Sequence, residues 1–247
     1  RRQRQMCIRD RCFAYDDGVP VLKNVSFKAG VGESYAIVGP TGAGKTTIVN
    51  LISRFYNLTS GQVLIDGIDI SRVTIKSLRT QMGVMMQDSF IFAGTIMDNI
   101  RYGNMEASDE DVIKAAKTVC AHDFIMNFPD GYDTHIEQGG SNVSGGQKQR
   151  LCIARALLKK PKILILDDST SAVDTHTDAM IRKAFKEEIP GTTKLIIAQR
   201  ISSIQDSNII IVMENGQVAC VGDHETLMKN SDFYRGIYES QQKGSED

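Results

Sequence analysis

An α/β fold built around a parallel sheet is the fold class that this sequence predicts. Short aliphatic runs, among them residues 163–166 and 209–212, have the near-continuous apolar character of strands covered on both faces. These runs alternate with segments of helical spacing such as residues 45–55. Parallel strands need a crossover, which a helix usually supplies, so the alternation favours a parallel α/β core. A mostly helical stretch interrupts the pattern at residues 88–158, which we expect to be an inserted lobe.

Length, charge and cysteine usage exclude several classes of protein. The chain has 247 residues, enough for one large domain with a sizeable core. Its 29 basic and 30 acidic residues give a net charge of −1, so we expect no nucleic-acid partner. The five cysteines lack C-x-x-C spacing, which indicates reduced thiols rather than disulfides or a zinc site. No run approaches the ~20 apolar residues of a membrane-spanning helix.

The first eleven residues differ from the rest, since six of them are charged and none belongs to the apolar run of a signal peptide. We expect residues 1–11 to be either a non-native segment or a polar linker. One domain then covers residues 12–240, and residues 241–247 form a tail. Within this domain we expect a core with its β-rich part at residues 12–87 and 159–240. A helical lobe is expected at residues 88–158.

The elements are expected in the following order. A hairpin is predicted at residues 12–27, because two alternating segments flank a turn at residues 16–18. A buried strand, a helix and two further strands follow at residues 34–38, 45–55, 63–65 and 83–86. Ser108 and Asp111 are expected to form a capping box at the start of the helical stretch. The last strands and helices are expected at residues 163–166, 195–197 and 209–212, and at residues 177–188 and 225–229.

A phosphate-binding loop is predicted where the strand at residues 34–38 ends. Residues 39–46 read Gly-Pro-Thr-Gly-Ala-Gly-Lys-Thr and match the pattern G-x-x-x-x-G-K-[ST]. Glycines let backbone N–H groups turn toward a phosphate, and the following helix N-terminus adds positive potential. Lys45 is expected to reach the terminal phosphates, and the Thr46 hydroxyl to bind Mg²⁺. A glycine-rich turn without a ligand is the alternative. The predicted nucleotide-binding residues here are Gly39, Pro40, Thr41, Gly42, Ala43, Gly44, Lys45, Thr46 and Thr47.

A second element of the same site is predicted at Asp167, which ends the aliphatic run of residues 163–166. In open α/β sheets ligands bind outside the carboxyl ends of the strands. Asp167 is therefore expected to hold Mg²⁺ through a water molecule.

Further motifs carry a family resemblance over residues 12–238. Residues 142–150 read Asn-Val-Ser-Gly-Gly-Gln-Lys-Gln-Arg and resemble the signature motif of ATP-binding cassette (ABC) ATPases, with Val143 where leucine is usual. Residues 171–174 resemble the D-loop of that family, and residues 89–100 and 137–140 are similar to segments of exporter-type cassettes. The resemblance implies a RecA-like P-loop NTPase core with an antiparallel β subdomain and an inserted α-helical subdomain.

The resemblance also implies partners, cofactors and a location. ATP and Mg²⁺ are the expected cofactors. A second nucleotide-binding domain and the transmembrane domain of an exporter are the expected partners, at the cytoplasmic face of the plasma (inner) membrane. Transport would be driven by ATP-dependent dimerisation of the two cassettes.

Individual roles are implied by position, each beside a simpler reading. Tyr15 matches the aromatic residue that stacks on adenine, or it is an ordinary strand residue. Gln87 matches the Q-loop glutamine that touches Mg²⁺, or it is an exposed polar residue. Ser144, Gly145, Gly146 and Gln147 would contact ATP held by the second cassette, or they cap a helix. Asp174 would touch the partner across the dimer seam, or it is a helix N-cap.

Two positions depart from the family pattern. Asp168 stands where the family has a glutamate that polarises the attacking water, and Gln199 stands where a histidine contacts the γ-phosphate. Together with Lys45 they are the expected catalytic residues. Because the carboxylate is shorter and glutamine cannot become cationic, we expect ATP binding with slow turnover. The pair resembles the degenerate half of a heterodimeric exporter, so the second cassette is expected to be a different chain.

Two other functions remain open from the sequence. One is a soluble ABC-type ATPase clamp without a membrane partner, against which the exporter-like residues 89–100 stand. The other is a regulatory module that binds ATP without hydrolysing it, which Asp168 permits.

Overall fold

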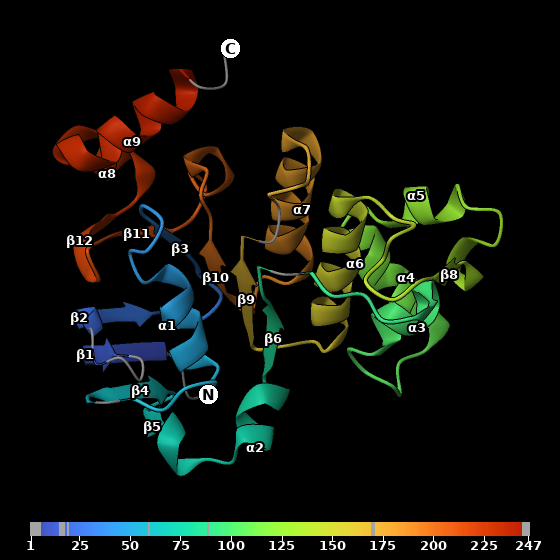
Figure 1. Cartoon of the computed structure of the whole chain (residues 1–247), viewed down its shortest axis with the longest axis horizontal. Coiled ribbons are helices and arrows are strands. Elements are labelled where there is room, and N and C mark those ends of the chain that lie inside the picture. Colours follow the sequence, from blue (N-terminus) through green and yellow to red (C-terminus); the bar gives the residue numbers. More distant parts are fainter. Residues whose placement is uncertain are drawn as a thin grey trace. The chain divides into compact units, whose positions relative to one another are not determined.

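The computed structural model describes residues 6–14, 18, 20–58, 60–87, 89–168 and 171–243 (Figure 1). The chain divides into two compact units, Arg1–Arg79 with Thr193–Asp247 and Thr80–Thr192. The predicted helical lobe belongs to the second unit, which begins before and ends after residues 88–158. Across the described ranges, no helix has both the length and the apolar character needed to cross a lipid bilayer.

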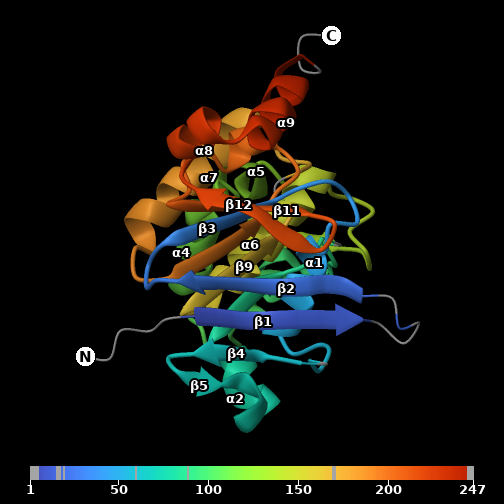
Figure 2. The same cartoon turned by 90° about the vertical axis from the view of Figure 1, so that its left-hand side faces the viewer.

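An antiparallel sheet in the first unit has the strand order β2–β1–β4–β5 (Figure 2). β1 (Met6–Ala14) lies between β2 (Pro20–Ala29) and β4 (Gln62–Ile65), and β5 (Ile68–Asp69) pairs with β4. The predicted hairpin is confirmed, but its first strand is longer than expected. Met6 lies opposite Ala29 on one side and Ile65 on the other, so residues 6–11, expected to be a non-native segment or a linker, lie in a paired strand.

The second sheet contributes four strands to the first unit, in the order β12–β11–β3–β10, and all but β12 are parallel. β3 (Ser34–Val38) pairs in parallel with β10 (Thr193–Ile197) and with β11 (Ile209–Glu214), while β12 (Gln217–Gly222) is antiparallel to β11. Four of the five residues of β3 are buried, as expected for a central parallel strand. The helices that precede and follow these strands are α1 (Lys45–Ile52), η1 (Ile70–Arg72), α2 (Ile75–Thr80), η3 (Ile201–Ser203), α8 (His224–Asn230) and α9 (Asp232–Lys243).

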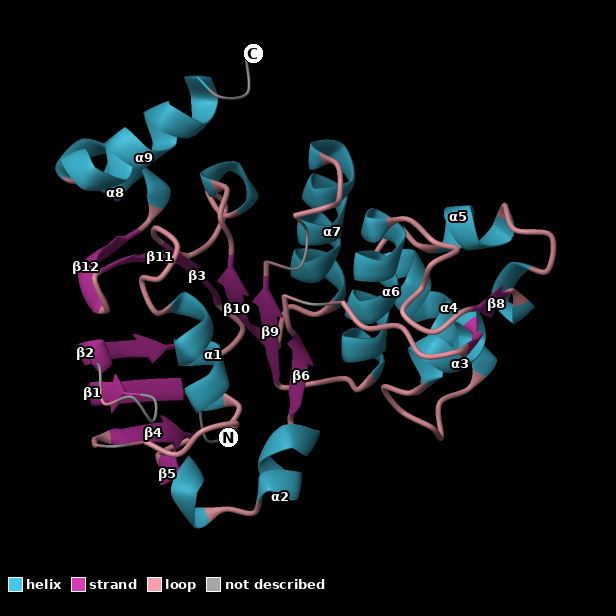
Figure 3. Ribbon diagram, viewed as in Figure 1, coloured by secondary structure: helices cyan, strands magenta, loops and turns pink. Residues whose placement is uncertain are grey.

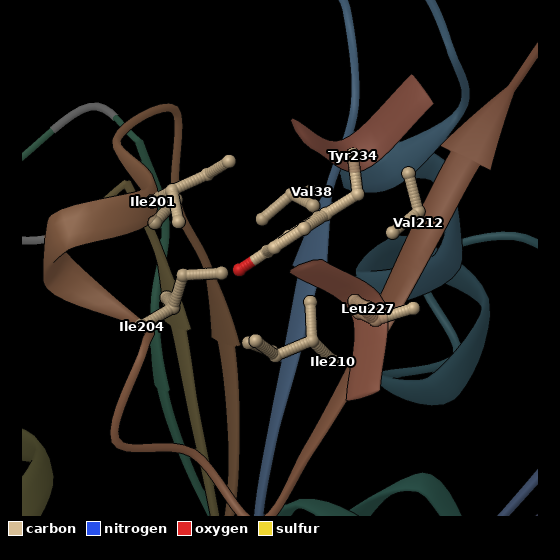
Figure 4. Packing of buried hydrophobic residues seen from close by; sticks show 9 residues of the cluster. Val38, Ile201, Ile204, Ile210, Val212, Leu227 and Tyr234 are labelled. Atoms are coloured by element: carbon tan, nitrogen blue, oxygen red, sulfur yellow. The ribbon is translucent and has the colours of Figure 1, made fainter. Parts of the chain in front are cut away.

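One apolar cluster ties this layer to the C-terminal helices. The ring of Tyr234 from α9 is fully buried and lies among Val38, Val212 and Leu227 (Figure 4). Ala36, Ala198, Ile201, Ile204 and Ile210 complete the buried cluster.

The second unit is mostly helical (Figure 3). Its two longer strands, β6 (Met82–Met85) and β9 (Ile163–Asp167), pair in parallel, and the short strands β7 (Gly94–Thr95) and β8 (His135–Ile136) are antiparallel. The helices are α3 (Ile96–Arg101), α4 (Asp109–Thr118), α5 (His122–Met126), η2 (Gly131–Asp133), α6 (Gly145–Leu158) and α7 (Thr175–Glu188).

The stretch from Ser108 to residue 158 is mostly helical, as expected, with α4, α5 and α6 inside it; Gly131, Gly139 and Gly140 adopt positive φ in the segment between α5 and α6. Two other expectations need correction. Ser108 does cap α4, accepting from the Asp111 N–H at 3.3 Å, but the reciprocal bond of a capping box forms instead at α3 and α6. The expected tail at residues 241–247 begins inside α9, which extends to residue 243.

Candidate functional site

The loop between β3 and α1 has a backbone that only glycine can adopt at two positions. Gly39 has φ +148°, and a Cβ atom there would lie 2.2 Å from the backbone oxygen of Met213 in β11. Gly44 has φ +93° and is the N-cap residue of α1, without a side-chain cap. The first N–H groups of a helix have no partner within the helix. An uncapped N-terminus therefore presents donors that suit an anion.

Lys45 lies over this loop. Its Nζ atom donates hydrogen bonds to the carbonyl oxygens of Gly39 and Pro40 at 2.7 and 2.8 Å. The Ala43 N–H donates to the Pro40 oxygen at 3.2 Å and closes the turn beneath. A phosphate bound in the loop would thus meet an ammonium group and backbone donors together. Of the two following residues, Thr46 is half-buried, whereas Thr47 is buried in α1.

Gln199 lies at the same sheet edge as the loop. The parallel register pairs Ile197 of β10 with Ile37 of β3, so Gln199 and Gly39 both stand two residues beyond a matched pair. Gln199 is exposed, and its backbone carbonyl accepts a hydrogen bond from Gln241 of α9 at 2.6 Å. Within the first unit, the loop and Gln199 therefore follow the carboxyl ends of two adjacent strands, β3 and β10.

Gln87, Asp167 and Asp168 lie at the carboxyl ends of two adjacent strands of the second unit, β6 and β9. Met85 of β6 pairs with Leu166 of β9, so the carboxyl ends of both strands lie side by side. Asp167 is the last residue of β9 and is 1% exposed, while Gln87 is exposed. Asp168 has φ +47°, in the left-handed region where aspartate is enriched among non-glycine residues.

The signature residues begin helix α6. Ser144 is its N-cap: the Ser144 hydroxyl accepts from the Gln147 N–H at 3.3 Å, and Gln147 Oε1 accepts from the Ser144 N–H at 2.9 Å. Ser144 and Gln147 therefore cap this helix. A capping box does not occupy the N–H groups of Gly145 and Gly146, so the helix start retains donors for an anion.

The segment after β9 is held against α6 by a residue that the sequence reading missed. Gln149 is 6% exposed; its Nε2 donates to the Ser171 hydroxyl and its Oε1 accepts from the Ala172 N–H, both at 3.0 Å. A signal was present, because Gln149 precedes the buried Cys152 and Ile153 at helical spacing.

Asp174 is the N-cap of α7. Its carboxylate accepts from the Thr177 N–H at 2.9 Å, and this hydrogen bond holds the pKa of Asp174 below its ordinary value. The N-cap reading of Asp174 is confirmed. Tyr15, the expected adenine-stacking residue, lies outside the described residues.

Three residues carry oxygen ligands of the types that Mg²⁺ prefers, each taken by itself: the hydroxyl of Thr46, the amide of Gln87 and the carboxylate of Asp167. Thr46 belongs to the first unit, and the other two residues belong to the second.

Comparisons with known proteins identify a family. The family described as "ABC transporter" matches residues 22–171, and the family described as "P-loop domain" matches residues 101–242. The uncharacterized ABC transporter ATP-binding protein YfiC of Bacillus subtilis is 50% identical over 233 residues, covering 94% of this chain and 39% of YfiC. The ATP-dependent lipid A-core flippase of Syntrophus aciditrophicus is 46% identical over 236 residues, covering 96% of this chain and 39% of the flippase.

A solved structure extends the similarity to the fold. A bacterial Atm1-family ABC exporter with ATP bound matches with a TM-score of 0.94 and 41% identity, covering 97% of this chain and 42% of that one. The chain thus spans about two fifths of the length of these relatives. The expected P-loop NTPase fold is confirmed, and the chain belongs to the ABC transporter family, as an ATP-binding domain of the ABC ATPase type.

Proposed function

We propose that this chain is the ATP-hydrolysing cassette of an ABC exporter. ATP-dependent pairing with a second cassette would drive a transmembrane domain, with the chain at the cytoplasmic face of the plasma (inner) membrane. The names of its relatives support an exporter, since they include a lipid A-core flippase and an Atm1-family exporter. The observation that carries the proposal is the loop of residues 39–46, with Lys45 folded over it and Gln199 at the end of the neighbouring strand.

The chain's own residues would divide the work as follows. Lys45 and the N–H groups of the loop bind the phosphates, and Gln199 donates a hydrogen bond to the γ-phosphate. Asp168 orients the attacking water. Thr46, Gln87 and Asp167 would hold Mg²⁺, which when bound neutralises phosphate charge.

This site is proposed to turn over slowly. An aspartate at residue 168 is one methylene shorter than glutamate, which retracts its oxygens by about 1 Å, and a displacement of that size can lower a rate on the order of 10²-fold. Gln199 can donate a hydrogen bond but cannot carry the positive charge of a histidine. Neither substitution touches the loop that binds ATP.

The signature residues are proposed to serve another site. Ser144, Gly145, Gly146 and Gln147 would complete the ATP site of a partner cassette, which is proposed to be a different chain bearing the usual glutamate and histidine. The exposed position of Ser144 and Gly145 at the start of α6 supports this role.

Single-turnover and steady-state ATPase assays test the proposal. The wild-type chain alone should bind MgATP but hydrolyse it slowly, and Asp168→Glu with Gln199→His should raise the rate by about 10²-fold. Adding the partner cassette should also raise the rate. Full-rate hydrolysis by the isolated wild-type chain, or an unchanged rate in the double variant, would contradict the slow site. Lys45→Ala is the control that should lose binding.

A further inference from the structure

The loop that carries Gln199 is anchored to the C-terminal helix α9. Ala198, Ile201 and Ile204 of this loop are 6%, 0% and 0% exposed, and they pack in the same cluster as Tyr234 of α9 (Figure 4). The Tyr234 hydroxyl is itself hydrogen-bonded to His224 Nδ1 of α8 at 2.8 Å. The apolar side of the loop is therefore fixed to α9 near the start of that helix.

A second anchor, Gln241, lies about two helical turns further along α9. Gln241 Nε2 donates to the carbonyl oxygen of Gln199 at 2.6 Å, and Gln241 Oε1 accepts from the N–H of Ile201 at 2.8 Å. One amide group thus bonds the backbone on both sides of Arg200. Only a side chain with a donor and an acceptor on the same terminal group can make this pair of bonds.

Both anchors lie on one face of the helix. Tyr234, Ile237, Tyr238 and Gln241 have the spacing i, i+3, i+4 and i+7, which places them on a single stripe. Ile237 and Tyr238 are partly buried against the same cluster. Along this face of α9, the first three side chains pack on the apolar cluster, and Gln241 forms hydrogen bonds with the backbone of the loop.

We propose that Gln241 is a positioning residue for Gln199, so that α9 fixes the backbone from which Gln199 reaches the γ-phosphate. The inference rests on the proposed role of Gln199. Gln241 does not touch the nucleotide; it orients the peptide groups that flank Arg200. The phosphate loop is held by its own contacts, from Lys45 to Gly39 and Pro40, and does not depend on Gln241.

Three variants of Gln241 separate its two hydrogen bonds. Gln241→Met keeps the length and apolar stem but makes neither bond. Gln241→Glu keeps an acceptor for the Ile201 N–H and loses the donor to the Gln199 carbonyl. Ser240→Ala, at an exposed neighbouring position of α9, is the matched control.

The experiment uses the full-length protein, with single-turnover hydrolysis, the Kd of MgATP and amide hydrogen exchange at Ile201. Both Gln241 variants should lower the hydrolysis rate by about three- to tenfold while the Kd changes by less than about twofold. The Ile201 amide should lose protection in Gln241→Met and keep it in Gln241→Glu. Ser240→Ala should match wild type in all three measurements.

The outcomes distinguish a failure of this inference from a failure of the proposed function. Gln199→Ala that slows hydrolysis, combined with Gln241 variants that hydrolyse at the wild-type rate, would overturn the positioning role alone. Gln241 variants that weaken MgATP binding as much as they slow hydrolysis would show a general structural role instead. An unchanged rate in Gln199→Ala would remove the role of Gln199, and the positioning role with it.

Discussion

Gly39 is constrained by the strand beside it rather than by a ligand. A Cβ atom at this residue would meet the backbone oxygen of Met213 at 2.2 Å, and a carbonyl within a paired strand cannot move without disturbing its neighbours. Gly39→Ala should therefore lower the free energy of unfolding by about 1–3 kcal/mol more than Gly42→Ala, as measured by urea unfolding.

Gly42→Ala is the matched control for this comparison. Gly42 also has positive φ, +81°, but a Cβ atom there would meet nothing within 4 Å. Its alanine variant should lose only the about 1–2 kcal/mol of a left-handed conformation. Equal losses for the two variants would show that the approach of Met213 does not constrain Gly39.

Among the elements, α6 and the segment before α7 depend on Gln149. Gln149→Leu would remove both hydrogen bonds of the buried Gln149 amide, and at about 0.5–1.5 kcal/mol each their loss costs about 1–3 kcal/mol. Urea unfolding should show a loss of this size, while Gln138→Leu, at an exposed position of the same unit, should change stability by less than about 0.5 kcal/mol. Equal stability of the two variants would contradict the role of Gln149.

The docking of α9 should weaken at alkaline pH. Burial raises the pKa of Tyr234 to about 12, and ionisation in the unfolded chain occurs near pH 10. A folded-state pKa above the unfolded value gives stability that is present below pH 10 and is lost as the pH rises toward 12. Unfolding free energies measured from pH 8 to pH 11 should fall less steeply in Tyr234→Phe than in wild type. A slope identical to that of wild type would contradict this assignment.

The elements show where sequence patterns suffice. The strand predicted at residues 34–38 has the bounds of β3, because a central parallel strand is apolar along its whole length. β12 was missed because its residues alternate between exposed and half-buried, as in an edge strand with a weak apolar signal. The sequence patterns predicted no helix at α9, although Tyr234, Ile237 and Tyr238 carry helical spacing.

For the molecule as a whole, the sequence predicts the motifs of the site but not the contacts that hold those motifs in place. Each functional segment follows a strand that the sequence marks clearly: residues 39–46 after β3, Gln87 after β6, Asp168 after β9 and Gln199 after β10. Some of the residues that hold these segments come from distant parts of the chain and lie in no motif. Met213 and Gln241 became recognisable only through the backbone groups that they approach, whereas Gln149 lies within the signature motif at residues 142–150.

Measurements of the stability of the whole chain should distinguish residues that bind ATP from residues that act only in its hydrolysis. A ligand that binds only the folded state stabilises it by mass action, by about 2.7 kcal/mol at a concentration of 100 times Kd. MgATP at that excess should therefore raise the unfolding free energy of wild type and of Asp168→Asn alike, since Asp168 is proposed to act on water and not on binding. Lys45→Ala should show no gain, because it removes the ammonium that lies over the phosphate loop. A gain in wild type that disappears in Asp168→Asn would mean that this carboxylate helps to hold the nucleotide, and the slow site would then need a different explanation.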